Sequence, residues 1–439
     1  MHRTRALLTL LIAAPAFEVA AQAPAPLKLS FADAVSHATG NAPAVTIAGL
    51  RTEEAGARER VARAPLLPTF AIGGTYLNRS FNSRSIGITF PGIPELIGPF
   101  NNYDGRLTAT QTVLDLSSIA RVRAAKAAVT GSTADERAVV ENAALTTALV
   151  YLRGTRSLAL VSARRADSSI AAELVHLAEE QRKAGVSAAI DVTRARTQLV
   201  VAEGQLILAA DASDRDRIDL ARTLGLDPAT PIQLTDTLSS ALAVVPRPEN
   251  RDSAIARALE DRPDLAAEHA RGDAARQASS AISAERLPRL AVEGDYGVNG
   301  PTVPSAIMTR QLAVSLNIPL LDGFGREGRK AEQDALARES DVREHDLRQQ
   351  IAADIDVAVI EINAAEAQQQ IAAERLRLAE DELSQSRERF AAGVAGNIEV
   401  INAQSSLILA RDADIESRFG AANARVALAR ALGMARTLH

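Results

Sequence analysis

The chain contains no cysteine and no tryptophan, and no segment after the N-terminus offers 18 consecutive apolar residues. The lack of cysteine excludes disulfide bonds and lipid attachment to an N-terminal cysteine. The lack of long apolar runs predicts that no helix crosses a membrane. With a formal net charge of −5 and no basic cluster, the sequence gives no support for binding to nucleic acid.

Proline is missing from two long stretches, residues 116–227 and 320–439. Together with the abundance of Ala, Arg, Glu and Gln, this predicts long helices. The runs 118–184 and 324–392 could each form about 100 Å of helix at 1.5 Å per residue. Helices of that length are expected to pack side by side as coiled coils, although Thr133–Glu136 fits a capping box that would break the first one.

The N-terminus is typical of a secretory signal peptide. Residues 1–5 are basic, residues 6–14 are largely apolar, and Val19-Ala20-Ala21 supplies small residues for cleavage. We expect residues 1–21 to be removed, which places the mature chain outside the cytoplasm. An exported chain without a spanning helix is expected either to stay soluble or to enter a membrane as a β-barrel.

Two segments, residues 182–199 and 390–407, are copies of one helical hairpin. In each, a helix stops at a glycine (Gly185 or Gly393), turns tightly and restarts as a second helix. Glycine suits such a turn because it adopts positive φ without a Cβ clash. An acidic residue, Asp191 or Glu399, follows each turn at the same place, 208 positions apart. Asn397 is expected to be the N-cap of the second returning helix.

Alternating apolar and polar residues predict two pairs of strands, one pair in each half of the chain. The expected strands lie near residues 66–77, 102–113, 287–298 and 309–319. An ordinary half-buried sheet is one interpretation of this pattern. The placement of the aromatic residues favours a membrane barrel with an interfacial girdle, because eight of them lie in or beside these strands: Phe70, Tyr76, Phe81, Phe90, Phe100, Tyr103, Tyr296 and Phe324.

The repeats predict a division of the mature chain into two similar halves. Residues 22–230 form the first repeat and residues 251–439 the second, joined by a linker at 231–250. Each repeat is expected to contain a helix, a strand pair and a long helical hairpin: strands within 66–113 and a hairpin at 118–225 in the first, strands within 287–319 and a hairpin at 324–434 in the second. The prolines and Asn78 between Tyr76 and Asp115 predict a longer loop in the first repeat.

Four strands leave two unpaired edges in lipid, so closure of the sheet into a barrel needs more than one copy of the chain.

The sequence resembles the TolC-like outer membrane efflux family over essentially its whole mature length. The resemblance rests on motifs that occur in order and in two copies. They are Leu29-Ser-Phe31 with Asn41-Ala-Pro43, Arg262-Pro-Asp-Leu265, the strand openings at Pro68 and Pro288, Ile318-Pro-Leu-Leu-Asp-Gly323, and the turn that begins at Phe390. The resemblance implies a homotrimer with a twelve-stranded β-barrel in the Gram-negative outer membrane and a long α-helical barrel in the periplasm. It implies an exit duct for tripartite efflux or type I secretion, with a periplasmic adaptor and an inner-membrane transporter as partners.

The resemblance also assigns roles to the two turns. It implies that the turns form the periplasmic tip that meets the adaptor, through Gly185, Val186, Phe390, Gly393 and Val394. It further implies that acids just past the turns line the pore constriction, here Asp191 and Glu399. A second acid expected one turn later is replaced by Asn402, and a tyrosine and an arginine often found near the gate are replaced by Phe390 and Ala395. Helix capping remains the alternative role for the two acids.

Competing chemistry finds little support in the sequence. Gly323-Phe-Gly325-Arg-Glu-Gly328 has the spacing of a dinucleotide fingerprint, but Pro319 interrupts the preceding strand and no returning strand is expected. The histidines His37, His176, His269 and His345 are scattered and lack ligand spacing. Asp214-x-Asp216 lacks the glycine of a calcium loop. We therefore expect no cofactor, no metal site and no enzymatic activity.

A soluble periplasmic coiled-coil adaptor or scaffold is the alternative function. Adaptors also carry helical hairpins, but an adaptor is expected to have one hairpin flanked by short β-domains. The two hairpins and the two aromatic strand pairs found here favour the channel.

Overall fold

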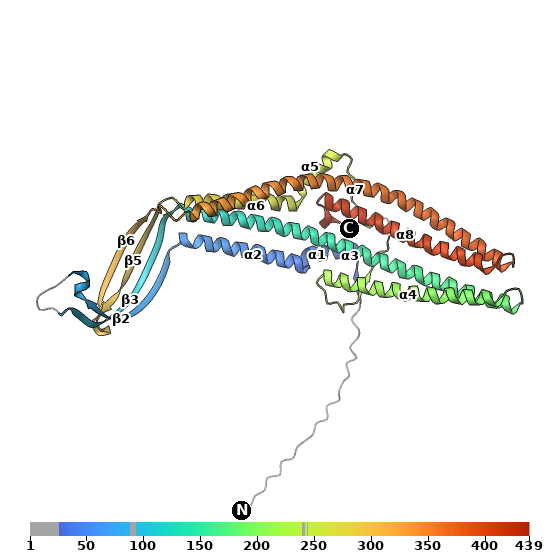
Figure 1. Ribbon diagram of the computed structural model, residues 1–439, viewed down its shortest axis with the longest axis horizontal. Coiled ribbons are helices and arrows are strands. Elements are labelled where there is room, and N and C mark those ends of the chain that lie inside the picture. Colours follow the sequence, from blue (N-terminus) through green and yellow to red (C-terminus); the bar gives the residue numbers. More distant parts are fainter. Residues whose placement is uncertain (1–25, 88–93, 239–241, 244, 439) are drawn as a thin grey trace, which may run out of the picture.

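The computed structural model describes residues 26–87, 94–238, 242–243 and 245–438. The expected signal peptide, residues 1–21, lies outside these described residues. The described chain is long and narrow, with a sheet at one end, helices along the rest and two helical turns at the far end (Figure 1). The main strands are β2 (Thr69–Asn82), β3 (Leu96–Asp115), β5 (Arg289–Gly300) and β6 (Ile307–Asn317). The long helices are α3 (Leu116–Lys183) and α7 (Gly325–Ala391), and the shorter ones are α1 (Phe31–Asn41), α2 (Pro43–Arg63), α4 (Ala189–Thr223), α5 (Arg251–Asp261), α6 (Pro263–Ala284) and α8 (Asn397–Ala431).

The helices pack side by side, and the shorter ones lie end to end along the long ones, α2 with α4 and α6 with α8 (Figure 1). Helix α3 packs against α2 and α4 on one side and against α6 and α8 on the other, and α7 packs against α6 and α8. Figure 1 shows the resulting order across the body, with α7 at one edge and α2 and α4 at the other. The predicted fold class, long helices joined to four strands in two repeats, is confirmed.

The four main strands form an antiparallel sheet in the order β2-β3-β5-β6. Its register places Ile72 opposite Leu107, Leu107 opposite Tyr296, and Gly294 opposite Leu312. Since paired residues share a face, one face of the sheet is predominantly apolar. The other face carries the polar residues between them, including Thr108, Asp295 and Gln311. Arg106 joins Asp104 and Asp295 on that polar face, at 2.7 and 2.6 Å.

Several boundaries differ from those that the sequence predicts. Asn78 and Pro99, expected in a loop, lie in β2 and β3, because pairing across the hairpin extends both strands. Helix α3 runs without a break through Thr133. The Thr133 hydroxyl donates to the carbonyl of Val129 one turn earlier instead of capping a new helix.

The first helix of each repeat is broken once by a proline. Ala42 and Arg262 take extended ψ angles of 139° and 117° before Pro43 and Pro263, because the proline ring disfavours a helical residue before it. The predicted linker also contains a short strand. Strand β4 (Ile232–Leu234) pairs in parallel with β1 (Leu27–Leu29), which ties the middle of the chain to its beginning.

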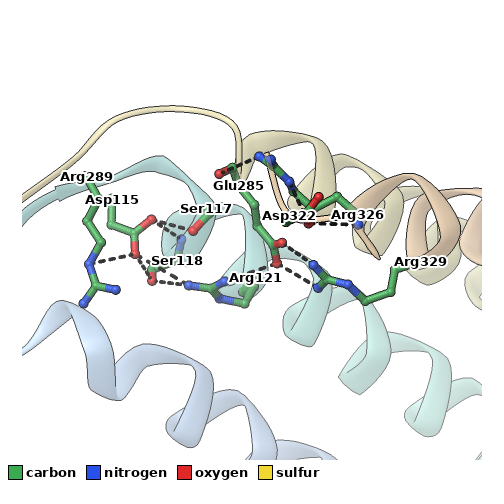
Figure 2. A network of polar contacts seen from close by, with 9 residues as sticks. All are labelled: Asp115, Ser117, Ser118, Arg121, Glu285, Arg289, Asp322, Arg326 and Arg329. Atoms are coloured by element: carbon green, nitrogen blue, oxygen red, sulfur yellow. Dashed lines mark hydrogen bonds and ion pairs between the residues drawn. The ribbon is translucent and has the colours of Figure 1, made fainter. Parts of the chain in front are cut away.

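A network of charged residues joins the sheet to the helices (Figure 2). Asp115 caps α3 by accepting from the backbone N–H of Ser118 at 3.0 Å, and its repeat counterpart Asp322 accepts from the N–H of Arg326 at 3.0 Å. Between them, the carboxylate of Glu285 pairs with Arg329 of α7 at 2.7 Å and with Arg121 of α3 at 3.6 Å. The two repeats thus enter their long helices through one shared polar junction.

The glycines of the candidate dinucleotide motif lie in this junction. Gly323 and Phe324 both have positive φ, 68° and 65°, and α7 begins at Gly325. The strand before them, β6, pairs antiparallel with β5, and α7 continues for 67 residues. The motif therefore forms a turn from sheet to helix and lacks the βαβ context of a dinucleotide site.

Arg262 links α6 to α7 as a buried cation. Its side chain is 5% exposed and pairs with Asp264 at 2.6 Å and with Asp354 of α7 at 3.1 Å. Replacing Arg262 with leucine is expected to lower the free energy of unfolding by about 3 kcal/mol, the low end for a broken buried ion pair, because both carboxylates remain partly exposed. Thermal unfolding followed by circular dichroism measures this loss.

The pH dependence provides a check on the Arg262 prediction. Burial works to raise the pKa of Asp264, but hydrogen bonds from Arg262 and its charge outweigh that effect and lower it. The stabilisation is therefore present above the ordinary carboxyl pKa and is lost as the pH falls through the lowered one. The stability gap between wild type and Arg262→Leu should narrow on acidification. Arg257→Leu is the control, because its exposed pair with Asp261 is worth at most about 1 kcal/mol.

Candidate functional site at the paired helical turns

The two turns at the far end of the helices share one geometry. At the end of α3, the N–H of Val186 donates to the carbonyl of Gln181, and Gly185 has a φ of 76°. At the end of α7, the N–H of Val394 donates to the carbonyl of Arg389, and Gly393 has a φ of 71°. Both are Schellman motifs, which need a residue in the left-handed conformation, and both glycines supply it.

An apolar cluster supports the turns from inside the helices. Phe390, at the end of α7, is only 3% exposed. It belongs to a cluster contributed by α3, α4, α7 and α8, whose members include Leu174, Val192, Leu383, Val400 and Leu407. The two hairpins are therefore anchored to one another a short distance behind their tips.

Among the hydrogen bonds that join the two hairpins, two lie close to the turns. The side-chain amide of Gln181 on α3 donates to the carbonyl of Phe390 on α7 at 2.7 Å. The side-chain amide of Asn397 on α8 donates to the carbonyl of Asp191 on α4 at 2.8 Å. Asn397 is fully buried, and the N-cap of α8 is Gly396, so the expectation that Asn397 caps this helix is wrong. The side chain of Asn397 instead fixes how one hairpin lies beside the other.

Asp191 lies at the start of α4 and acts there as a capping residue. Its carboxylate accepts from the backbone N–H of Ala188 at 3.3 Å and from the hydroxyl of Ser187 at 3.0 Å. Arg194, one turn later, approaches the same carboxylate at 3.8 Å. The side chain of Asp191 keeps 19% of its surface exposed. The carboxylate thus serves the helix and still reaches solvent.

Glu399, the counterpart of Asp191 on α8, has a different partner. Its carboxylate accepts from Nε of Arg389 at 2.8 Å, and its side chain is 40% exposed. Asn402, one turn further along α8, is exposed. The two repeat-related acids therefore differ in environment: one caps its helix and the other forms an ion pair across its own turn.

The predicted docking residues divide into two groups. Val186 and Val394 are 72% and 70% exposed at the very end of the molecule. A Cβ added at Gly185 or Gly393 would meet no atom within 4 Å, so both turns also have open surface. Phe390 differs because its ring is buried in the cluster described above. It supports the tip from within.

Sequence reasoning missed three residues of this site: Gln181, Arg389 and Asn397. Asn397 was noticed only as a cap. The partners of Gln181 and Asn397 come from the other repeat, 209 and 206 positions away. Pairing of that kind depends on how the two hairpins lie beside each other, which the sequence repeat does not define. Arg389 carried a local signal, since it lies ten positions before Glu399 across the turn.

No described helix combines the length and apolarity needed to cross a membrane. In the part of the chain that the structure describes, no group of three or more His, Cys, Asp or Glu side chains is placed to hold a metal ion.

The fold and the turns define a class of protein. A four-stranded sheet with one apolar face, continued by helices of about 100 Å, is the architecture of a channel protomer that crosses an outer membrane and extends into the periplasm. The chain belongs to the outer membrane efflux protein family, whose model matches residues 34–226 and 254–434. It is thus an outer-membrane duct for efflux or secretion. The family and its structural neighbours are channels and not enzymes.

Two relatives and a solved structure support this assignment. Protein CyaE of Bordetella pertussis is 26% identical over 389 residues, covering 87% of this chain and 79% of that protein. The pyoverdine export outer membrane protein OpmQ of Pseudomonas putida is 24% identical over 400 residues, covering 90% and 84%. Among solved structures, the outer membrane protein VceC of Vibrio cholerae matches with a TM-score of 0.77 at 19% identity, covering 92% of this chain and 96% of that one. The family match and the repeated strand pairs leave no basis for the soluble adaptor alternative.

Proposed function

We propose that three copies of this chain close head to tail into one duct. The observation that carries the proposal is that the strand sheet and the helical layer both have two free edges, and that the two edges of each are formed by different elements. The sheet ends in β2 on one side and β6 on the other, and the helical layer ends in α2 and α4 on one side and α7 on the other. Unlike edges that meet head to tail generate a ring. Three copies would give twelve strands, the number that the family resemblance implies.

Apolar side chains on the two helical edges support this closure. Large exposed residues on α4 include Val200, Ile207 and Leu208, and those on α7 include Val342, Ile360 and Ile371. All six are more than 60% exposed in the single chain. Exposed apolar surface on both edges is typical of a protomer whose edges become buried in an assembly.

The trimer is expected to be obligate. A sheet with unpaired backbone groups at both edges is unstable in lipid, because each unsatisfied group costs several kcal/mol there. Native mass measurement in detergent should show three chains and no stable monomer. Membrane fractionation serves as the second arm, with the protein expected in the outer-membrane fraction. A stable monomer in that fraction would contradict closure by copies of the same chain.

At the tip, we propose that Asp191, Glu399 and Asn402 line the pore constriction. All three lie in the first two turns of the returning helices, so symmetry would repeat each of them around one axis. Rings of carboxylates at the narrow end of a water-filled tube concentrate cations and repel anions. Because Arg389 pairs with Glu399, we infer that part of the negative potential of this ring is offset by the chain itself.

The same end of the molecule is proposed to dock a periplasmic adaptor, which in turn connects to an inner-membrane transporter. Family membership supports partners of these two classes. We assign the contact to Gly185, Val186, Gly393 and Val394, because these residues form the exposed outer surface of the turns. Phe390 would hold that surface in shape from the buried side.

A further inference from the structure

We propose that Arg310 binds a phosphate of an outer-leaflet lipid headgroup, an inference that rests on the proposed barrel. Arg310 lies in β6 opposite Tyr296, so its side chain shares a face with that ring. The hydroxyl of Tyr296 contacts the sulfur of Met308, on the same face, at 2.7 Å. Large exposed apolar side chains dominate this face, namely Phe70, Ile72, Leu107, Leu312, Val314 and Leu316. Its other polar residues are uncharged and include Asn78, Asn101 and Gln111. Within the described strands, Arg310 is thus the one cation on the face that would meet lipid.

Arg310 has no partner in the described part of the chain. No hydrogen bond or ion pair to its guanidinium occurs there, and the side chain is exposed. The acids of the central strands, Asp104, Glu293 and Asp295, pair in register with residues of the opposite, polar face. None of them can approach Arg310 without passing through the sheet.

A neighbouring copy cannot supply the missing anion from its edge strand. In the proposed ring, β6 of one copy lies beside β2 of the next. Strand β2 contains no Asp or Glu at any position from Thr69 to Asn82, so no register of the two strands pairs Arg310 with a carboxylate. In the loop that follows β2, the single acid is Glu95, and it already pairs with Arg84.

The depth of Arg310 places its charge within reach of the outer headgroups. The β5–β6 hairpin lies at the end of the sheet away from the helices (Figure 1), which is the extracellular end of a chain whose helices extend into the periplasm. Arg310 is the fourth residue of β6. It lies about 10 Å along the strand from Ile307, or about 7 Å in depth at a tilt near 45°. A long cationic side chain at that depth extends to the headgroup level.

Phosphate is the anion that fits this position. The guanidinium of arginine is planar and offers paired donors that match two oxygens of one phosphate group. Phosphates of outer-leaflet lipids lie at the headgroup level, and the adjacent ring of Tyr296 belongs to the amphipathic residues that favour the same level. The site would hold one lipid per protomer on the outer surface of the barrel.

The proposal is tested by lipid binding to the purified trimer. Delipidated protein in detergent is titrated with diphosphorylated lipid A and, separately, with dephosphorylated lipid A, and bound lipids are counted by native mass spectrometry. Wild type is expected to bind one phosphorylated lipid per chain and to bind the dephosphorylated form at least about tenfold more weakly, since a charge-assisted hydrogen bond is lost. Arg310→Leu should lose the preference for phosphate, and Arg310→Lys should keep part of it.

Arg79→Leu is the matched control. Arg79 lies towards the same end of the sheet but alternates with Tyr76, so it belongs to the polar face. Its removal should leave the phosphate preference unchanged. Equal binding of both lipids by wild type, or an undiminished preference in Arg310→Leu, would overturn the assignment. Trimers are counted before lipid is added, so a failure of the proposed assembly is seen separately.

Discussion

Channels of this protein in planar bilayers should be cation-selective and blocked from the periplasmic side by multivalent cations, and Asp191→Asn with Glu399→Gln should abolish that block. The expectation follows from the ring of carboxylates that threefold symmetry would place at the constriction. Such a ring raises the local concentration of a cation about tenfold or more. The blocking concentration in the double variant should rise by at least the same factor. Single-channel recording on both sides of the bilayer measures it.

Two further variants make this test specific. Arg389→Gln removes the partner of Glu399 at 2.8 Å and should strengthen the block, which is a change of opposite sign at the same site. Asp211→Asn with Glu416→Gln removes the same amount of charge from α4 and α8, about 25–30 Å further from the turns, and should leave the block as in wild type. An unchanged block in the Asp191 and Glu399 variant would limit both acids to stabilising the helix starts, as Asp191 does for α4.

The parts of the fold that the sequence predicts are those with a period or a repeat. The lack of proline from residue 116 to 227 predicts α3 and α4, and the alternation from Leu312 to Leu316 predicts β6. Strands β1 and β4 were missed because three residues carry no usable period. The end of β2 was placed too early and the start of β3 too late, because Asn and Pro favour loops locally. Hydrogen bonding between the two strands overrides that preference.

The candidate site divides in the same way. The glycines of the two turns could be predicted because positive φ after a helix is a local requirement. The contacts of Gln181 and Asn397 could not, since each reaches a backbone carbonyl of the other repeat. Equal spacing along the sequence does not specify how far one hairpin is shifted along the other. The burial of Phe390 has the same origin, because its cluster draws on four helices.

Val394→Trp should abolish export while leaving the yield of trimer unchanged. The side chain of Val394 is 70% exposed, and the Schellman hydrogen bond uses its backbone N–H, so a larger side chain leaves the helix end intact. A bulky group at the centre of a docking surface disrupts packing against the partner. We expect a loss of about 2 kcal/mol or more of binding free energy at such a position. This loss lowers the affinity for the adaptor at least about thirtyfold. Export by a deletion strain carrying the variant is the measurement.

Two matched variants separate docking from a general effect of bulk. Val186→Trp places the same group on the other turn, where the exposed fraction is 72%, and should impair export as well if both turns contact the adaptor. Val303→Trp is the control, because Val303 is 71% exposed at the opposite end of the molecule, in the hairpin between β5 and β6. Normal export by Val394→Trp, with trimers at wild-type yield, would mean that the glycine turns only end their helices and that the adaptor binds elsewhere along the duct.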